Sequence, residues 1–415
     1  MSFLGDLLST IFDRGNLSFG LSSKRGQPID AMMEALVNTN GETSGLALSR
    51  SILSEYDGLD DAAKLALFEH LAENMNINPD EVETCLKQYH QNPNKETYQA
   101  FMQAAEPQRQ ELFRRLNHAP GATAFLVRMR ADLLRLGRGN PRLEALDLDL
   151  KHLFLSWFNR GFLVLKRISW QSPAHILEKI IAYEAVHAID SWDDLRRRME
   201  PEDRRCFAFF HPSMPDEPLI FVEVALTQGI ANSIQVILAE NREVISGDAA
   251  DTAVFYSISN CQAGLAGISF GNSLIKQVVA DLTLEWPELK TFVTLSPIPK
   301  LAGWCQSMGI DLAQQNPDQL KALTAHYLLH AKNRHGWPYD PVSRFHLGNG
   351  ALIHALNGDA DLSEKGMAQS GGMMVNYLYD LPSVESNQDK FAEDHVIASA
   401  PDLAKWAEKF DPPSA

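Results

Sequence analysis

A glycine-rich stretch at residues 255–276 carries the clearest chemical signal in the sequence. A predicted strand ends near Ser259, and Gly264, Gly267 and Gly271 follow it before a predicted helix begins. Glycines at a strand-to-helix turn let backbone N–H groups approach a ligand, and a helix N-terminus favours phosphate. The spacing does not match the G-x-G-x-x-G dinucleotide fingerprint. The stretch therefore predicts a different phosphate-binding turn, with a purely structural turn as the alternative.

Two side chains further along the chain could perform chemistry beside such a turn. Ser296 stands at the end of a predicted strand, where Pro297 restricts it to an extended backbone. No G-x-S-x-G elbow surrounds it, so we expect a hydrogen-bonding role rather than an acylated nucleophile. His346 lies between Phe345 and Leu347, which predicts a half-buried imidazole able to move a proton near neutral pH. Each residue could instead be structural, the serine at a strand end and the histidine in the core.

Other polar patterns are weaker. His326 and His330 are four residues apart, but no H-E-x-x-H motif accompanies them, so no metal site is expected. The basic runs 196–198 and 204–205 are expected to form a solvated face, or else a local site for phosphates.

Composition limits the classes of partner. The chain has 415 residues, of which 45% are hydrophobic and 22% charged, as in folded proteins of two domains. Its net charge of −16 should repel nucleic acid and anionic membranes, so local donors must hold any anionic substrate. Four cysteines without a CxxC pair are expected to be reduced thiols. No apolar run reaches the roughly 18 residues of a membrane span, and residues 1–16 are expected to be at most a short amphipathic helix.

The elements that must position these residues fall into two parts. From residue 30 to 160 the apolar spacing is helical, with Asn78 before Pro79 as a helix start and a breaker loop at 137–141. Strands are predicted at 205–211, 218–227, 252–259 and 291–296, and a helix separates the last two. Residues 320–332 are predicted to be helical and residues 358–372 to form a loop. This pattern predicts a helical bundle at 1–160 and a mixed α/β domain at 161–415.

Together and in this order, these segments resemble malonyl-CoA decarboxylases. The glycine-rich turn by itself is similar to the pyrophosphate loop of GNAT-type acyltransferases, which hold coenzyme A. The resemblance runs from about residue 167 to residue 379, and a helical region of suitable length precedes it. The matching stretches are 168–173, 217–220, 224–227, 255–259, 262–276, 295–299, 345–351 and 374–379.

The resemblance implies a fold, a site and an assembly. The fold is an N-terminal all-helical domain that helps to build a homo-oligomer, expected to be a tetramer, followed by a mixed α/β, GNAT-like domain that binds acyl-CoA. Ser296 and His346 would be the catalytic pair. At the position of Ser269, relatives such as the animal enzyme carry a glutamate, so this chain cannot use a carboxylate there. The residues expected to contact coenzyme A are Gln262, Gly264, Ala266, Gly267, Ile268, Ser269, Phe270, Gly271 and Asn272.

The implied reaction is decarboxylation of malonyl-CoA to acetyl-CoA and CO2, a step of fatty acid metabolism. The thioester is its own electron sink, so no metal or other cofactor is expected. Ser296 would orient the malonyl group, and a protonated His346 would stabilise the enolate and protonate its carbon. The Ser-Lys-Leu ending of animal forms is absent, so we expect a bacterial-type cytoplasmic enzyme. Two alternatives stay open: a GNAT-fold acyltransferase acting on an amine, and a non-catalytic acyl-CoA sensor.

Overall fold

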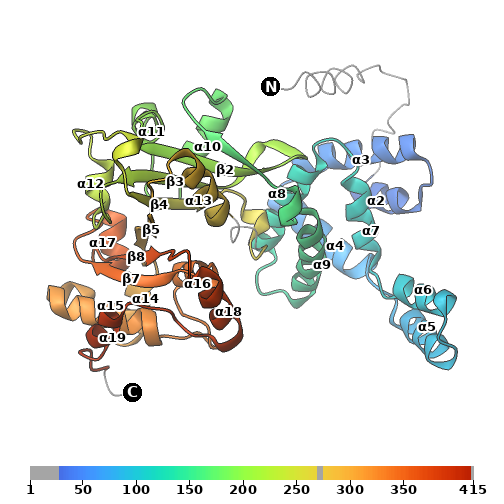
Figure 1. Ribbon diagram of the computed structural model, residues 1–415. Helices are drawn as coiled ribbons and strands as arrows, with labels where there is room; N and C mark the ends of the chain where they lie inside the picture. Colours follow the sequence, from blue (N-terminus) through green and yellow to red (C-terminus); the bar gives the residue numbers. More distant parts are fainter. Residues whose placement is uncertain (1–27, 269–273, 413–415) are drawn as a thin grey trace. The chain divides into compact units, whose positions relative to one another are not determined.

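The computed structural model describes residues 28–268 and 274–412 (Figure 1). The chain divides into two compact units, of which the first ends at Leu150. A short piece of it, Val127–Ala131, belongs to the second unit, which otherwise begins at Lys151. The amphipathic helix expected at residues 1–16 lies outside the described residues.

The first unit is helical, as predicted. Its core contains Tyr56, Phe68 and Phe113, all nearly inaccessible to solvent. The predicted helix start is confirmed, because the Asn78 side chain accepts hydrogen bonds from the N–H groups of Asp80 and Glu81. The helices are α2 (Ile29–Asn38), α3 (Glu42–Asp57), α4 (Asp61–Asn74), α5 (Pro79–Gln91), α6 (Lys95–Ala104), α7 (Gln108–Leu116), and parts of α8 (Ala122–Leu136) and α9 (Pro141–Trp157).

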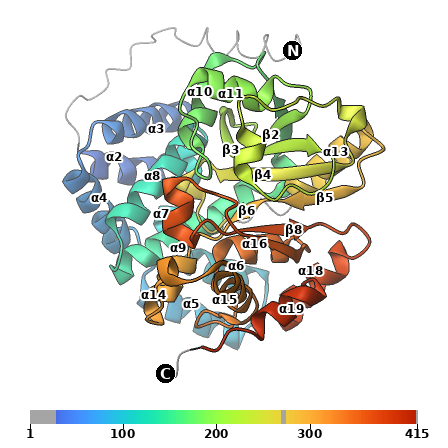
Figure 2. The same cartoon turned by 90° about the vertical axis from the view of Figure 1, so that its left-hand side faces the viewer.

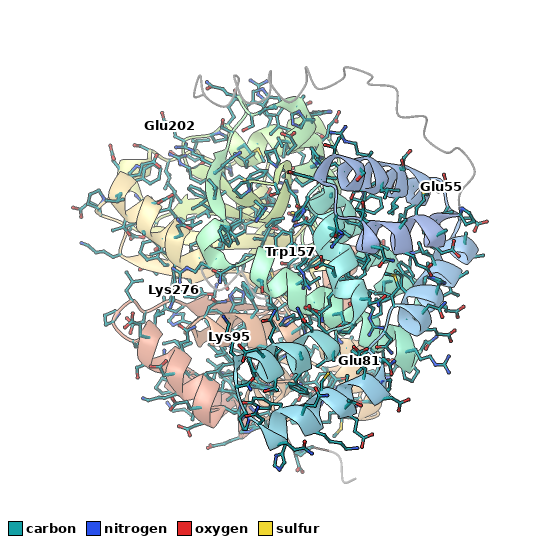
Figure 3. All side chains as sticks on the ribbon, turned by 90° about the vertical axis from the view of Figure 1, so that its right-hand side faces the viewer. Glu55, Glu81, Lys95, Trp157, Glu202 and Lys276 are labelled. Atoms are coloured by element: carbon teal, nitrogen blue, oxygen red, sulfur yellow. The ribbon has the colours of Figure 1, made fainter. Side chains whose placement is uncertain are left out.

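Helices α5 and α6 form a hairpin that buries no residue of either helix fully. Figure 3 labels Glu81 and Lys95, one on each helix. Tyr89 on α5 contacts Tyr98 and Phe101 on α6, so the two helices pack mainly through these aromatic rings.

The second unit is built on a mixed sheet of eight strands in the order β1-β2-β3-β4-β5-β8-β6, with β7 paired to β8. All neighbours are antiparallel except β4 and β5, which pair in parallel from Thr252 opposite Thr291 to Phe255 opposite Thr294. The first three predicted strands correspond to β2, β3 and β4, the fourth, 291–296, is divided between β5 and β6, and β1, β7 and β8 are additional. The strands are β1 (Val164–Ile168), β2 (Arg204–His211), β3 (Met214–Thr227), β4 (Thr252–Asn260), β5 (Thr291–Thr294), β6 (Ser296–Pro297), β7 (Leu352–Asn357) and β8 (Met374–Leu378).

Helices cover this sheet. On one face α10 (Ala174–Tyr183) and α11 (Trp192–Met199) bury Ile180 and Leu195 against alternate residues of β2, including Ala208 (Figure 2). The helix α13 (Leu274–Glu285) joins β4 to β5, as the sequence predicts. The remaining helices are α12 (Ile234–Leu238), α14 (Leu301–Ser307), α15 (Pro317–His330), α16 (Pro341–Gly348), α17 (Glu364–Ser370), α18 (Val384–Asp394) and α19 (Pro401–Ala407).

The prediction of a loop at residues 358–372 is wrong, because α17 lies within it. Ser363 caps this helix by accepting a hydrogen bond from the N–H of Gly366. Gly366 weakens the helical pattern in the sequence, but a Cβ there would lie 2.4 Å from Asp361 Cγ, so the position has room only for glycine. The fold class expected for the whole chain, a helical region followed by a mixed α/β domain, is confirmed. None of the described helices is long and apolar enough to cross a membrane.

Candidate active site

Ser296 and His346, which the resemblance implies are a catalytic pair, meet in the structure. Ser296 lies in β6, whose pairing with Val375 of β8 sets the position of its side chain. His346 lies on α16, which begins at the N-cap Asp340 followed by Pro341. Ser296 Oγ is 3.2 Å from His346 Nε2, and both residues are buried. Two side chains 50 residues apart in the chain therefore form one hydrogen-bonded pair.

The pair belongs to a longer chain of hydrogen bonds. Ser296 Oγ donates to Thr294 Oγ1 at 2.8 Å, so its oxygen is left to accept from His346 Nε2–H. The other ring nitrogen, Nδ1, is 2.8 Å from the hydroxyl of Tyr379, which then acts as its donor. The imidazole also stacks on the ring of Tyr377, with centroids 4.5 Å apart. These contacts assign the neutral tautomer with hydrogen on Nε2.

Sequence reasoning missed the partners Thr294 and Tyr379. Both lie in segments already singled out, Thr294 at the end of a predicted strand and Tyr379 in the stretch 374–379. Their side-chain chemistry gave no signal, because neither hydroxyl has a role until the fold brings Thr294 to Ser296 and Tyr379 to His346.

Burial controls the charge of His346. It lowers the pKa of the ring to about 3, from 6.5 for an exposed imidazole. Neither nitrogen contacts a carboxylate that would compensate for the lost hydration. The expectation of a protonated His346 disagrees with this environment, which favours a neutral ring that donates a hydrogen bond.

This environment makes a prediction for pH dependence. In nitrogen-15 NMR spectra, with the signal identified by its loss in His346→Asn, we expect a neutral His346 ring protonated on Nε2 from pH 5.5 to 8. The folded pKa of about 3 lies below the unfolded value of 6.5, so the unfolded chain binds the proton first as pH falls. The stabilisation by the neutral ring is complete above about pH 6.5 and is lost as pH falls towards 3. The His346→Asn variant should lose less stability over that range, and titration of the ring near pH 6.5 would contradict the assignment.

A cavity of about 750 Å³ opens beside the pair. Apolar and aromatic side chains form most of its wall, and Arg344 is the one charged side chain among its lining residues in the described chain. No carboxylate lines it there, so the cavity suits an anionic ligand. Its lining includes Val186, Phe255, Ile258, Asn260, Gly267, Ser296, Arg344, Phe345 and His346.

One wall of this cavity is formed by the end of β4, where this strand is no longer paired with β5. The pairing of β4 with β5 stops at Phe255, but β4 continues to Asn260. Ile258 and Asn260 lie beyond that point and line the cavity. An extended ligand with amide groups could pair with this backbone as an added strand would.

The predicted coenzyme turn reaches the same cavity through Gly267, which has a φ of +75°. A short 3-10 helix, Ala263–Leu265, precedes Gly267. Arg130 donates to the carbonyl oxygens of Gly264 and Ala266 at 2.8 and 3.0 Å. These bonds hold the carbonyl groups on the α8 side of the turn.

The other residues predicted for this turn differ in position. Ile268 is buried. The Gln262 side chain donates to the carbonyl oxygen of Pro218 and does not line the cavity. Ser269, Phe270, Gly271 and Asn272 lie outside the described residues.

Only part of the two basic runs forms the solvated face that the sequence predicted, since Arg196 is exposed and pairs with Glu200. Arg198, Arg204 and Arg205 are all buried. Arg198 donates to the carbonyl oxygens of His187 and Ala188 and pairs with Asp194, so it is part of the core structure.

The histidine pair on α15 has no further ligand near it. The rings of His326 and His330 lie 4.9 Å apart, and His326 also packs against Trp304. In residues 28–268 and 274–412, no three His, Cys, Asp or Glu side chains are grouped as metal ligands would be.

Comparison with known protein families identifies both parts of the chain. Residues 75–158 match the model of the malonyl-CoA decarboxylase N-terminal domain. Residues 161–318 and 307–409 match the model of the malonyl-CoA decarboxylase C-terminal domain.

Individual proteins agree with this. The crystal structure of malonyl-CoA decarboxylase from Rhodopseudomonas palustris is 48% identical, covers 91% of this chain and 98% of its own, and superposes with a TM-score of 0.86. The enzyme from Agrobacterium vitis is 44% identical over 91% and 99% of the two chains, also with a TM-score of 0.86. The mitochondrial malonyl-CoA decarboxylase of Mus musculus is 35% identical over 359 residues, 74% of this chain and 72% of that protein.

Proposed function

The chain belongs to the malonyl-CoA decarboxylase family, and we propose on this basis that it is a carboxy-lyase that converts malonyl-CoA to acetyl-CoA and CO2. The observation that supports this most is the buried Ser296–His346 pair, which lies in a cavity shared with the predicted coenzyme turn. Both the reacting group and its carrier would then have a place in one cavity.

The reaction needs two things from the protein. Loss of CO2 leaves the electron pair of the broken C–C bond on the thioester as an enolate, so hydrogen-bond donors at the thioester oxygen stabilise the transition state. The enolate carbon must then receive one proton. The thioester accepts the electron pair itself, and we propose that no metal or other cofactor takes part.

Ser296 would orient the malonyl group. Its hydroxyl is buried beside Thr294, and its single O–H would turn from Thr294 Oγ1 to an oxygen of the malonyl group to hold that group in place. The bond to the departing carboxylate could then be held perpendicular to the thioester plane, where its electrons overlap with the carbonyl.

His346 would supply the proton from Nε2. A neutral imidazole can polarise a carbonyl oxygen, so the low pKa of this ring does not prevent the role. As Nε2 gives up its proton, the hydroxyl of Tyr379 can supply one to Nδ1, and the resulting phenolate would regain a proton from water before the next turnover. Tyr379 in this scheme positions the ring and restores its proton without touching the substrate.

The coenzyme would bind along the cavity wall. The free side of β4 beyond Phe255 can pair with the two amide groups of the pantetheine arm. The turn containing Gly267 would face the pyrophosphate, which agrees with the lack of carboxylates in the described lining.

One assay tests this function against the alternatives. The purified protein, treated exhaustively with a chelator, is incubated with malonyl-CoA and no acceptor, and acetyl-CoA and CO2 are measured. We expect equal amounts of both products at an undiminished rate. An acyltransferase would require an added amine, and a sensor would bind the thioester unchanged. Activity that is lost on chelation and restored by one divalent ion would refute the cofactor-free mechanism.

A further inference from the structure

Lys151 lies beside the predicted coenzyme turn, although it comes from α9, far from the turn in the sequence. A Cβ on Gly267 would be 3.3 Å from Lys151 Nζ and 3.5 Å from its Cε. Gly267 lines the cavity and Lys151 does not, so the ammonium group stands next to one of the residues that line the cavity. Both residues belong to the second unit.

Other cations of the second unit differ in what they bind. Arg130 holds two carbonyl groups of the turn. Lys276 on α13, labelled in Figure 3, donates to Gln388 at 2.8 Å. Lys151 is partly buried, and within the described residues its ammonium group makes no hydrogen bond or ion pair. A partly desolvated cation without a counter-ion is unfavourable, so a ligand that brings an anion would gain by binding there.

We propose that Lys151 binds a phosphate group of the coenzyme moiety at the Gly267 turn. The inference rests on the proposed function, since it takes an acyl-CoA as the ligand. A lysine beside a glycine turn combines a point charge with backbone approach, the combination that phosphate sites use. With a net charge of −16, the chain must attract an anionic coenzyme through such local cations.

The test compares a full and a truncated substrate. Lys151→Gln keeps the length of the side chain nearly unchanged and removes its charge. We expect kcat/KM for malonyl-CoA to fall about 10- to 100-fold, the usual effect of losing one hydrogen bond to a charged group. With malonyl-pantetheine, which has no phosphate, kcat/KM should stay as in the wild type. The control Lys290→Gln makes the same charge change at an exposed site and should affect neither substrate.

An additional substrate identifies which phosphate Lys151 binds, and calorimetry separates this inference from the proposed function. If Lys151→Gln lowers kcat/KM for malonyl-CoA but not for malonyl-dephospho-CoA, Lys151 binds the 3′-phosphate. If it lowers kcat/KM equally for both substrates, Lys151 binds the pyrophosphate. If Lys151→Gln lowers kcat/KM equally for malonyl-pantetheine, which has no phosphate, the inference is overturned, because a structural role of Lys151 then explains the whole effect. If the wild type decarboxylates none of these thioesters, the proposed function fails. Calorimetry with free coenzyme A then still decides the role of Lys151, since Lys151→Gln must bind it more weakly than Lys290→Gln does.

Discussion

His346→Asn is expected to lower kcat by about 10²- to 10⁴-fold, the range typical of losing a general acid. The asparagine keeps a polar group in a buried position, so the fold should persist. The ring nitrogen that donates to Ser296 is lost, and with it the proton source for the enolate. Affinity for free coenzyme A should be unchanged, because that ligand lacks the malonyl group. Stopped-flow or coupled kinetics and calorimetry measure the two effects separately.

Ser296→Ala provides the companion experiment for this variant. Because Ser296 Oγ and His346 Nε2 are hydrogen-bonded, the two residues should act as a unit, and their effects should not add. We expect the double variant to be about as slow as His346→Asn. Additive losses in free energy would show that the two side chains act independently, and near-normal kcat in His346→Asn would remove the histidine from the mechanism.

Gly264→Ala is expected to destabilise the second unit by roughly 3 kcal/mol, the upper end of the usual effect of overpacking. A Cβ at this position would lie 1.8 Å from the carbonyl oxygen of Val127 on α8. Both colliding groups are held by backbone, so no side-chain rotation can relieve the clash. The turn must move, which would also displace Gly267 from the cavity. Chemical denaturation measures the first effect, and calorimetry should show coenzyme A binding weakened by at least about tenfold, or 1.4 kcal/mol.

Gly303→Ala is the matched control. It makes the same change within α14, where a Cβ would meet nothing within 4 Å. We expect it to be neutral or to stabilise by up to about 1 kcal/mol through helix propensity. Equal stability and equal coenzyme affinity in the two variants would contradict the close approach of Gly264 to α8.

Much of the fold could be predicted because its signals are local. Helical spacing, the Asn78–Pro79 start and the three long strands β2, β3 and β4 depend on neighbouring residues in the chain, and the structure agrees. The short strands β7 and β8 were missed, since a strand of five or six residues looks like a loop until it has partners. The helix α17 was missed because it contains Gly366, which is needed there since a Cβ would collide with Asp361.

The sequence by itself determined the candidates for chemistry, namely the glycine turn, Ser296 and His346. Residue type and local pattern were enough for that. The tertiary structure alone decided their partners and charges, because hydrogen bonding and desolvation depend on groups far apart in the chain. Sheet pairing brings Thr294 and Tyr379 to the pair, and burial makes His346 neutral. For the same reason Arg198, Arg204 and Arg205 of the basic runs are internal, and Lys151 lies beside the predicted coenzyme turn although its helix showed no chemistry in the sequence.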